Sequence, residues 1–182
     1  MKYFNSKAFL IAIIFCLVYT NSSGQNKTLE HSGDALLLVL PTSAVVATLI
    51  HKDKKGTIQF VKSFLLNAAI TYGLKGMVDK ERPDLSDHNS FPSGHTSATF
   101  QSASFLQRRY GWEYGIPAYA LAGFTAFTRV NAKKHDGWDV LVGAAIGIGS
   151  TYIFATPYQQ EHFELTYETE RDQHLISFKY KF

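Results

Sequence analysis

Three cations placed at fixed points of the sequence could hold an anion that carries several oxygens. Lys75 and Arg82 are separated by six residues, and Pro83 follows Arg82 and stops a helix from continuing there. Arg129 comes much later, at the end of another apolar segment. A phosphoryl group in transfer needs such fixed donors around its oxygens. An isolated lysine or arginine is usually a surface charge, but three at these positions predict an oxyanion site.

The tetrapeptide Pro92-Ser93-Gly94-His95 adds backbone donors and a proton carrier. Ser93 is placed as the N-cap of a helical segment, so that the first N–H groups of that helix can face an anion. Gly94 allows the backbone to approach closely, and the Ser93 hydroxyl would be a further donor. An ordinary Pro-Ser helix start is the alternative interpretation, and His95 directly after the glycine favours a phosphate seat with an acid–base histidine.

His135 and Asp139 are separated by four positions, so on a helix that begins nearby they would share one face. A carboxylate there can accept the Nδ1 proton of the imidazole, which leaves Nε2 free to attack phosphorus. Asp136 would point elsewhere and is the poorer candidate. A His–Asp pair that only stabilises a helix start is the alternative, but Arg129 in the same segment favours catalysis. The residues together predict phosphate ester cleavage.

Zinc binding is a competing interpretation, because two histidines and Asp139 are suitable ligand types. Three cations around the same pocket would repel a divalent ion and already supply the positive charge that a metal would supply. We therefore expect neither a metal nor a cofactor. The single cysteine, Cys16, lies in the N-terminal apolar run, so that the rest of the chain offers no thiol nucleophile and no disulfide.

Five apolar segments would position the motifs, which all fall near segment ends. They cover residues 34–50, 58–77, 96–106, 115–128 and 140–156, and their periodicity predicts helices. The glycines of the last segment favour close helix packing. We expect an all-α bundle of about five helices. The segment 96–106 is short and rich in Ser, Thr and Gln, which argues against full insertion, so that we expect a bundle only partly immersed in a membrane.

The two ends of the chain differ from the bundle in character. Residues 1–24 have the pattern of an export signal, with Lys2 and Lys7, an apolar run and small residues ahead of position 25, and an uncleaved anchor is the alternative. The segments 162–168 and 174–182 alternate apolar and polar residues, which predicts a β-hairpin covering the bundle. The expected organisation is a leader at 1–24, a phosphatase domain at 25–158 and a hairpin extension at 159–182.

The charge distribution bears on partners and on orientation. A net charge of +3 over 182 residues gives no support to nucleic-acid binding. If the segments span a bilayer, the basic residues of 51–55 and 108–109 fall on one side and the three motifs on the other. By the positive-inside bias, the site would then face the periplasm or the cell exterior.

The three motifs resemble the type 2 phosphatidic acid phosphatase superfamily, which also contains bacterial non-specific acid phosphatases and vanadium haloperoxidases. The family pattern K-x6-RP, PSGH and SR-x5-H-x3-D matches from Lys75 to Asp139, with Thr128 in place of the serine. Thr128 keeps a hydroxyl, so only its fine placement is in doubt. The resemblance implies that His135 forms a phosphohistidine, that Asp139 orients it, and that His95 protonates the leaving alkoxide. By the same resemblance the phosphate is held by Lys75, Arg82, Ser93, Gly94, Thr128 and Arg129.

The resemblance also implies an all-helical core, no metal, and inhibition by vanadate or phosphate. The apolar helices and the outward-facing site favour a lipid phosphate at a membrane, such as phosphatidate, phosphatidylglycerol phosphate, a polyprenyl diphosphate or a lipid A phosphate. A soluble periplasmic acid phosphatase and a non-catalytic phospholipid-binding envelope protein remain alternatives. A vanadium haloperoxidase is less favoured, because those chains are much longer.

Overall fold

The structure is a computed structural model that describes residues 25–158, 163–170 and 173–180. The leader predicted at 1–24 lies outside the described residues. The predicted helical bundle is confirmed, and the described chain contains five helices. They are α2 (Gln25–Ile50), α3 (Lys54–Met77), α4 (Gly94–Tyr110), α5 (Trp112–Asn131) and α6 (Gly137–Phe154).

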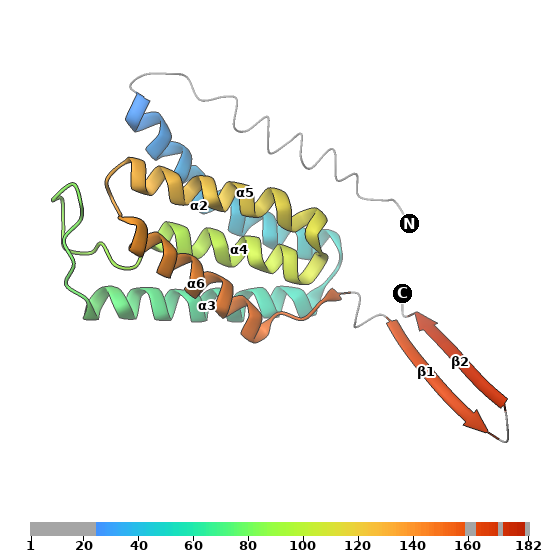
Figure 1. Ribbon diagram of the computed structural model, residues 1–182. Helices are drawn as coiled ribbons and strands as arrows, with labels where there is room; N and C mark the ends of the chain where they lie inside the picture. The colour runs from blue at the N-terminus through green and yellow to red at the C-terminus, as the bar shows by residue number, and fades with distance from the viewer. Residues whose placement is uncertain (1–24, 159–162, 171–172, 181–182) are drawn as a thin grey trace.

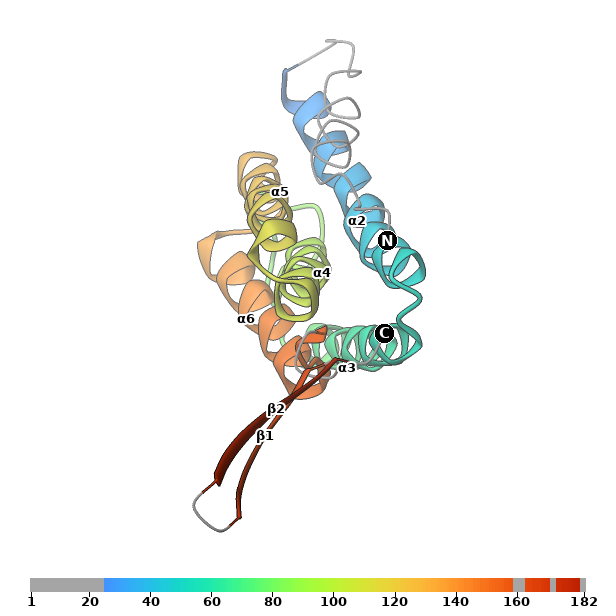
Figure 2. The same ribbon diagram turned by 90° about the vertical axis from the view of Figure 1, so that its right-hand side faces the viewer.

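Helix α4 is the centre of the bundle, and the other four helices pack around it (Figures 1 and 2). It is nevertheless the most polar of the five, and its Ser, Thr and Gln side chains are almost all buried. The hydroxyls donate to carbonyls one turn back, as Thr99 does to His95, and Gln101 donates to the Ser63 hydroxyl of α3. The polarity of 96–106 therefore does not argue against membrane insertion, because neighbouring helices shield this segment.

Close contact between α4 and α6 depends on two glycines of α6. A Cβ atom on Gly143 would lie 2.6 Å from the carbonyl oxygen of Ser93, and one on Gly147 would lie 2.3 Å from that of Ser97. The glycines therefore let the two backbones approach directly, as the glycine-rich pattern of this segment predicts.

The end of the bundle opposite the motifs is held by a buried ion pair. Arg109, at the end of α4, donates from Nε and Nη2 to the two carboxylate oxygens of Asp53 at 2.6 and 2.7 Å. Asp53 also caps α3 by accepting from the Gly56 amide, and Tyr110 donates to it. This bidentate, fully bonded pair ties α3 to α4. It is thus a structural contact, and Arg109 is not a free basic residue of that end.

The outer surface of the bundle is apolar on every outer helix. Leu38 of α2, Leu65 of α3, Ile116 of α5 and Ile153 of α6 are each between 62% and 70% exposed. Two described helices, Lys27–Ile50 and Gly137–Phe154, are long and apolar enough to cross a membrane. A polar centre inside an apolar surface suits a bundle that is surrounded by lipid.

The described residues after the bundle form two strands, β1 (Phe163–Glu170) and β2 (Gln173–Tyr180). They pair antiparallel, with Phe163 opposite Tyr180 and Glu170 opposite Gln173. We expected a hairpin lying over the bundle, but Figures 1 and 2 show the strands extending away from it. The backbone groups that face the other strand pair with it, and the outward-facing groups of each strand form the two edges of the sheet.

Candidate functional site

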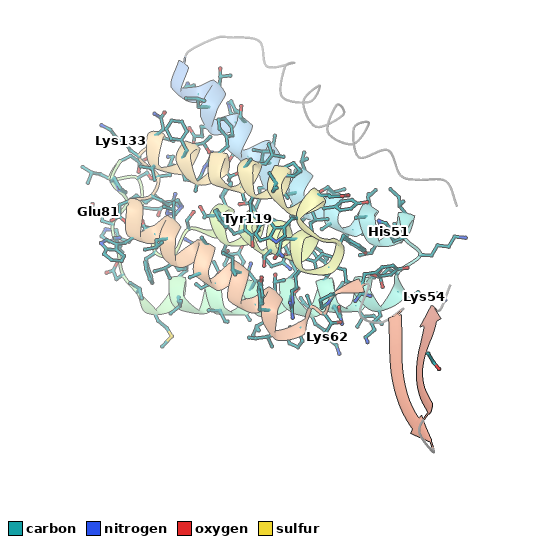
Figure 3. All side chains as sticks on the ribbon, turned by 45° about the vertical axis from the view of Figure 1, so that its right-hand side comes forward. His51, Lys54, Lys62, Glu81, Tyr119 and Lys133 are labelled. Carbon is teal, nitrogen blue, oxygen red and sulfur yellow. The ribbon has the colours of Figure 1, made fainter. Side chains whose placement is uncertain are left out.

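The three motifs meet at one end of the bundle. The segment 78–93 joins the end of α3 to the start of α4, and the turn 132–136 joins the end of α5 to the start of α6. Figure 3 shows Glu81 and Lys133 from these two connections at the same end, whereas His51 and Lys54 lie at the other. The basic connection between α2 and α3 is therefore on the side opposite the motifs, as predicted.

A cavity of about 310 Å³ opens at this end, and six of the nine predicted site residues line it. These are Lys75, Arg82, Gly94, His95, Arg129 and His135. The remaining wall is mostly apolar and comes from α2, α3 and α4, with Leu37, Phe64, Ala68, Tyr72 and Ala98. The structure thus brings both histidines and all three predicted cations to one hollow, next to an apolar wall.

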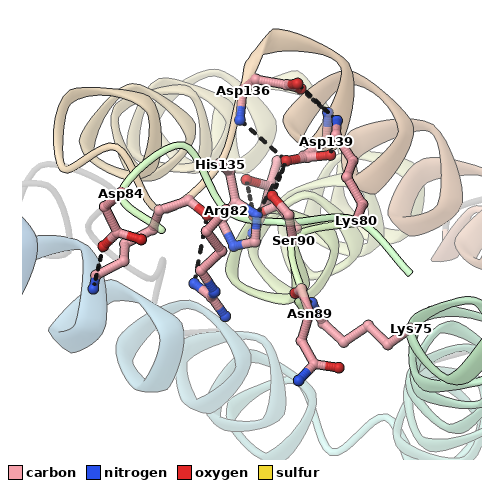
Figure 4. Close-up of polar contacts among 12 residues, drawn as sticks. Lys75, Lys80, Arg82, Asp84, Asn89, Ser90, His135, Asp136 and Asp139 are labelled. Carbon is pink, nitrogen blue, oxygen red and sulfur yellow. Dashed lines mark hydrogen bonds and ion pairs between the residues drawn. The ribbon is translucent and has the colours of Figure 1, made fainter. Parts of the chain in front are cut away.

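His135 lies beside Asp139, but not on a shared helix face. Helix α6 begins at Gly137 with Asp136 as its N-cap, so His135 precedes the helix and the cap turn brings the pair together. Its Nδ1 lies 3.5 Å from Oδ2 of Asp139 and makes no hydrogen bond within the described residues (Figure 4). The pair is therefore at ion-pair distance in this structure, and a small shift of the ring would close a hydrogen bond.

The Asp139 carboxylate is fully buried and is held by groups that the motifs do not contain. Lys80 Nζ donates to Oδ1 at 2.7 Å, while the Ser90 hydroxyl and the Asp136 amide donate to Oδ2 at 2.5 and 3.1 Å. Lys80 also donates to Asp136 at 2.7 Å. Asp136 is the N-cap of α6 and accepts from the Asp139 amide. These donors fix the position of the Asp139 carboxylate before any substrate binds.

The environment of His135 keeps its imidazole neutral. The side chain is only 3% exposed. Burial, together with the positive charges of Arg82 and Lys75, lowers the pKa of His135 to about 4. Burial and Arg82 likewise lower the pKa of Lys75. A neutral imidazole has a free lone pair, which a nucleophile requires.

The pKa of His135 should rise when a neighbouring cation is removed. We expect the imidazole of the full chain in detergent to titrate near pH 4 by NMR, and at a higher pH in Lys75→Gln, because a positive charge is lost. Lys62→Gln, on the same helix but exposed, is the control and should leave the value unchanged. An unchanged titration in Lys75→Gln would mean that burial and Arg82 set the pKa of His135 without a contribution from Lys75. Between pH 6.5 and 4, His135 binds a proton in the unfolded chain but not in the folded one. The free energy of unfolding should therefore fall as the pH drops through that window.

Ser93, Thr128 and Asp139 lie behind the cavity wall. Ser93 is the N-cap of α4, as predicted, but its hydroxyl is fully buried and pairs with the backbone and side chain of Thr96. The Thr128 hydroxyl donates to the Thr125 carbonyl at 2.7 Å and accepts from Arg129 Nε at 3.3 Å. In this structure both hydroxyls bond to neighbouring protein groups, and the phosphate contacts predicted for them stay a prediction.

The two cations of the first motif are anchored by the segment 78–93. Lys75 Nζ donates to the Asn89 carbonyl at 2.6 Å. Arg82 Nε donates to Asp87 at 2.7 Å, and its Nη1 lies 3.5 Å from the Lys134 carbonyl. Because these contacts use only part of each group, donors remain for a ligand in the cavity that both residues line.

His95 and Arg129 share a partner from α2 that the motifs do not include. The same oxygen, Oδ1 of Asp34, lies 2.9 Å from His95 Nε2 and 2.8 Å from Arg129 Nη1. Arg129 also donates to the backbone carbonyl of Glu30 at 2.5 Å. Asp34, Lys80 and Ser90 are therefore site residues that sequence reasoning missed. The one available signal was an acid, Asp34, at the head of an otherwise apolar run.

The chain is similar to known proteins in sequence and in fold. The chain is similar to the lipid A 4'-phosphatase of Helicobacter pylori (strain J99), with 31% identity over 79% of the chain and 78% of the relative. It is also similar to the lipid A 1-phosphatase of Porphyromonas gingivalis, with 42% identity over 37% of the chain but only 16% of that relative. A crystal structure of Aquifex aeolicus LpxE has the same fold, with a TM-score of 0.62 and 20% identity over 79% of this chain and 92% of the other.

Residues 56–163 match the family model of the PAP2 superfamily. The match covers most of α3 and all of α4 to α6, and therefore all three motifs, whereas α2 precedes it. On this match and on the similarity to the Helicobacter pylori protein, the chain belongs to the PAP2 superfamily.

Proposed function

We propose that this chain is a membrane-associated phosphatase that hydrolyses the phosphate monoester of a lipid, and that its substrate is of the lipid A class. The observation that supports this most directly is one cavity lined by two histidines and three cations beside an apolar wall. A phosphate would lie among the cations, and the apolar wall would contact the hydrocarbon part of the lipid. The two relatives named as lipid A phosphatases favour this substrate class.

In the first step, Nε2 of the neutral His135 attacks phosphorus and forms a P–N bond, while the P–O bond to the lipid breaks. His95 gives a proton to the leaving oxygen, so that the lipid leaves as an alcohol. Lys75, Arg82 and Arg129 balance the charge on the phosphoryl oxygens, and the start of α4 at Gly94 adds backbone donors. Asp139 stabilises the positive charge that develops on His135.

In the second step, water attacks phosphorus and gives its proton to His95, which is now a base. The P–N bond breaks, and inorganic phosphate leaves while His135 becomes neutral again. The first step takes one proton from His95 and the second step returns one to it from water, so that the cycle closes with water as the only further reactant. Phosphate and vanadate, which occupy the same oxyanion seat, should inhibit.

The site is proposed to face the periplasm or the cell exterior. Support comes from the basic α2–α3 connection at the opposite end of the bundle and from the export pattern of residues 1–24. The apolar outer surface places the cavity within reach of lipid headgroups.

Phosphate release by the purified full chain in detergent tests the proposal. The substrates are a lipid A phosphate, phosphatidate, a polyprenyl diphosphate and p-nitrophenyl phosphate. We expect the highest kcat/KM with the lipid A phosphate. Equal activity on all esters, from a protein that salt alone extracts from membranes, would support a soluble acid phosphatase. No release from any ester would support a phospholipid-binding protein.

A further inference from the structure

Helix α2 reaches the site because one of its residues has no side chain. A Cβ atom on Gly33 would lie 2.1 Å from Thr128 Oγ1 and 2.7 Å from Arg129 Nη2. With glycine there, the backbone of α2 lies directly against the end of α5, and the Glu30 carbonyl accepts from Arg129. The packing thus places the next residue, Asp34, at the edge of the cavity.

One carboxylate oxygen of Asp34 contacts site residues on two different helices. Its Oδ1 accepts from Arg129 Nη1 on α5 and from His95 Nε2 on α4, at 2.8 and 2.9 Å. The His95 side chain is 29% exposed and that of Arg129 only 4%. Because an ionised carboxylate only accepts hydrogen bonds, Nε2 of His95 must carry a proton in this arrangement.

The tautomer of His95 decides which of its two ring nitrogens can donate a proton to the leaving group. With Nε2–H held by Asp34, the proton that passes to the leaving oxygen must come from Nδ1 of the imidazolium. After transfer, His95 is neutral and still bonded to Asp34 through Nε2–H, and Nδ1 has the lone pair that can accept a proton from water. The contact thus keeps the ring in one orientation through both steps.

We propose that Asp34 is a positioning residue of the phosphatase site, which orients His95 for proton delivery to the leaving oxygen. The inference rests on the proposed function. Asp34 lies outside the three motifs and outside residues 56–163, so the catalytic unit includes α2 as well as the matched helices.

A comparison of leaving groups tests the role. Asp34→Asn should lower kcat/KM for a lipid phosphate about 10- to 100-fold, because an alkoxide needs the proton from His95. It should change kcat/KM for p-nitrophenyl phosphate by about threefold at most, because that leaving group departs with little protonation. Glu113→Gln is the control, since Glu113 is an exposed acid in the first turn of α5, at the end of the helix away from Arg129.

The outcomes separate this role from others. An equal loss on both substrates would overturn the proposal and indicate a structural residue, and a gain on both would indicate a carboxylate that competes with phosphate for Arg129. In a His95→Ala background, Asp34→Asn should cause no further selective loss on the lipid phosphate. A selective loss that persists there would also overturn the proposal.

A measurement without turnover keeps this inference distinct from the proposed function. Three charged groups act on the His95 ring, namely Asp34 from α2, Arg129 from α5 and Arg82 from the segment 78–93. Removing the carboxylate leaves the two cations, so the NMR titration of His95 should move to lower pH in Asp34→Asn. If the His95 titration is the same in Asp34→Asn as in wild type, the inference is overturned. If it shifts as expected but the wild type releases no phosphate, only the proposed function is overturned.

Discussion

Replacement of His135 by alanine is expected to abolish turnover, lowering kcat by about 10⁴-fold or more. The substitution removes the atom that would form the bond to phosphorus. The neighbouring Asp139 cannot replace it, because its carboxylate is fully buried and bonded to Lys80 and Ser90. Phosphate release from the preferred lipid phosphate, followed in detergent for wild type and variant, measures the loss.

Phosphate affinity should survive the same substitution. Lys75, Arg82 and Arg129 line the cavity independently of His135, and removing a neutral imidazole takes no positive charge away. Titration of the variant with inorganic phosphate by calorimetry should therefore give a Kd within about a factor of ten of the wild-type value. Loss of both turnover and binding would point to a collapsed site and would not support the role of nucleophile.

A matched control and a trapping experiment complete the test. His88 lies in the segment 78–93 near the site, but it is exposed and pairs with Asp79 on the surface, so that His88→Ala should retain full activity. Wild type quenched in alkali during turnover of a ³²P-labelled substrate should carry an acid-labile label, and His135→Ala should carry none. A label that persists in His135→Ala would place the covalent intermediate on another residue.

The bundle and most of the cavity lining follow from local sequence signals. Long periodic apolar segments predict helices because burial needs one apolar stripe per helix. The spacing of Lys75 and Arg82 places Lys75 in the last turn of α3 and Arg82 beyond its end. The Ser93 cap could be predicted for the same reason, since capping depends on neighbouring residues. Local signals therefore suffice where the interaction itself is local.

The other features depend on contacts between distant residues. Asp34 meets His95 and Arg129 only after α2 packs on α5, and nothing within the apolar run of α2 shows which residue will face the site. The polar α4 resembles an exposed helix in composition, yet it is central because its hydroxyls bond to the preceding turn. His135 was expected on a helix, but the reciprocal cap between Asp136 and Asp139 starts α6 after it.

Gly147→Ala should cause a large loss of stability, about 3 kcal/mol or more. The added Cβ would lie 2.3 Å from the Ser97 carbonyl oxygen and 2.7 Å from the Gln101 amide nitrogen. Both atoms belong to the backbone of α4, so no side chain can rotate to make room. Helices α4 and α6 must then move apart, which opens the centre of the bundle.

Gly149→Ala is the control for this substitution, because it lies on the same helix and a Cβ there meets nothing within 4 Å. Alanine is the better helix former, so this variant should be as stable as wild type or more stable by about 0.5–1 kcal/mol. Thermal unfolding of both variants at one heating rate in the same detergent compares them directly. Similar midpoints for the two variants would contradict the close α4–α6 contact.

The same contact connects stability to the site. The Ser93 amide donates to the Asp139 carbonyl at 3.0 Å, so the start of α4 and the start of α6 are bonded where the catalytic groups lie. Separation of the two helices at Gly147 should therefore also displace Asp139 from His135, and kcat should fall in Gly147→Ala at temperatures where the variant is still folded. Full activity in a destabilised Gly147→Ala would show that the two ends of α4 and α6 move independently.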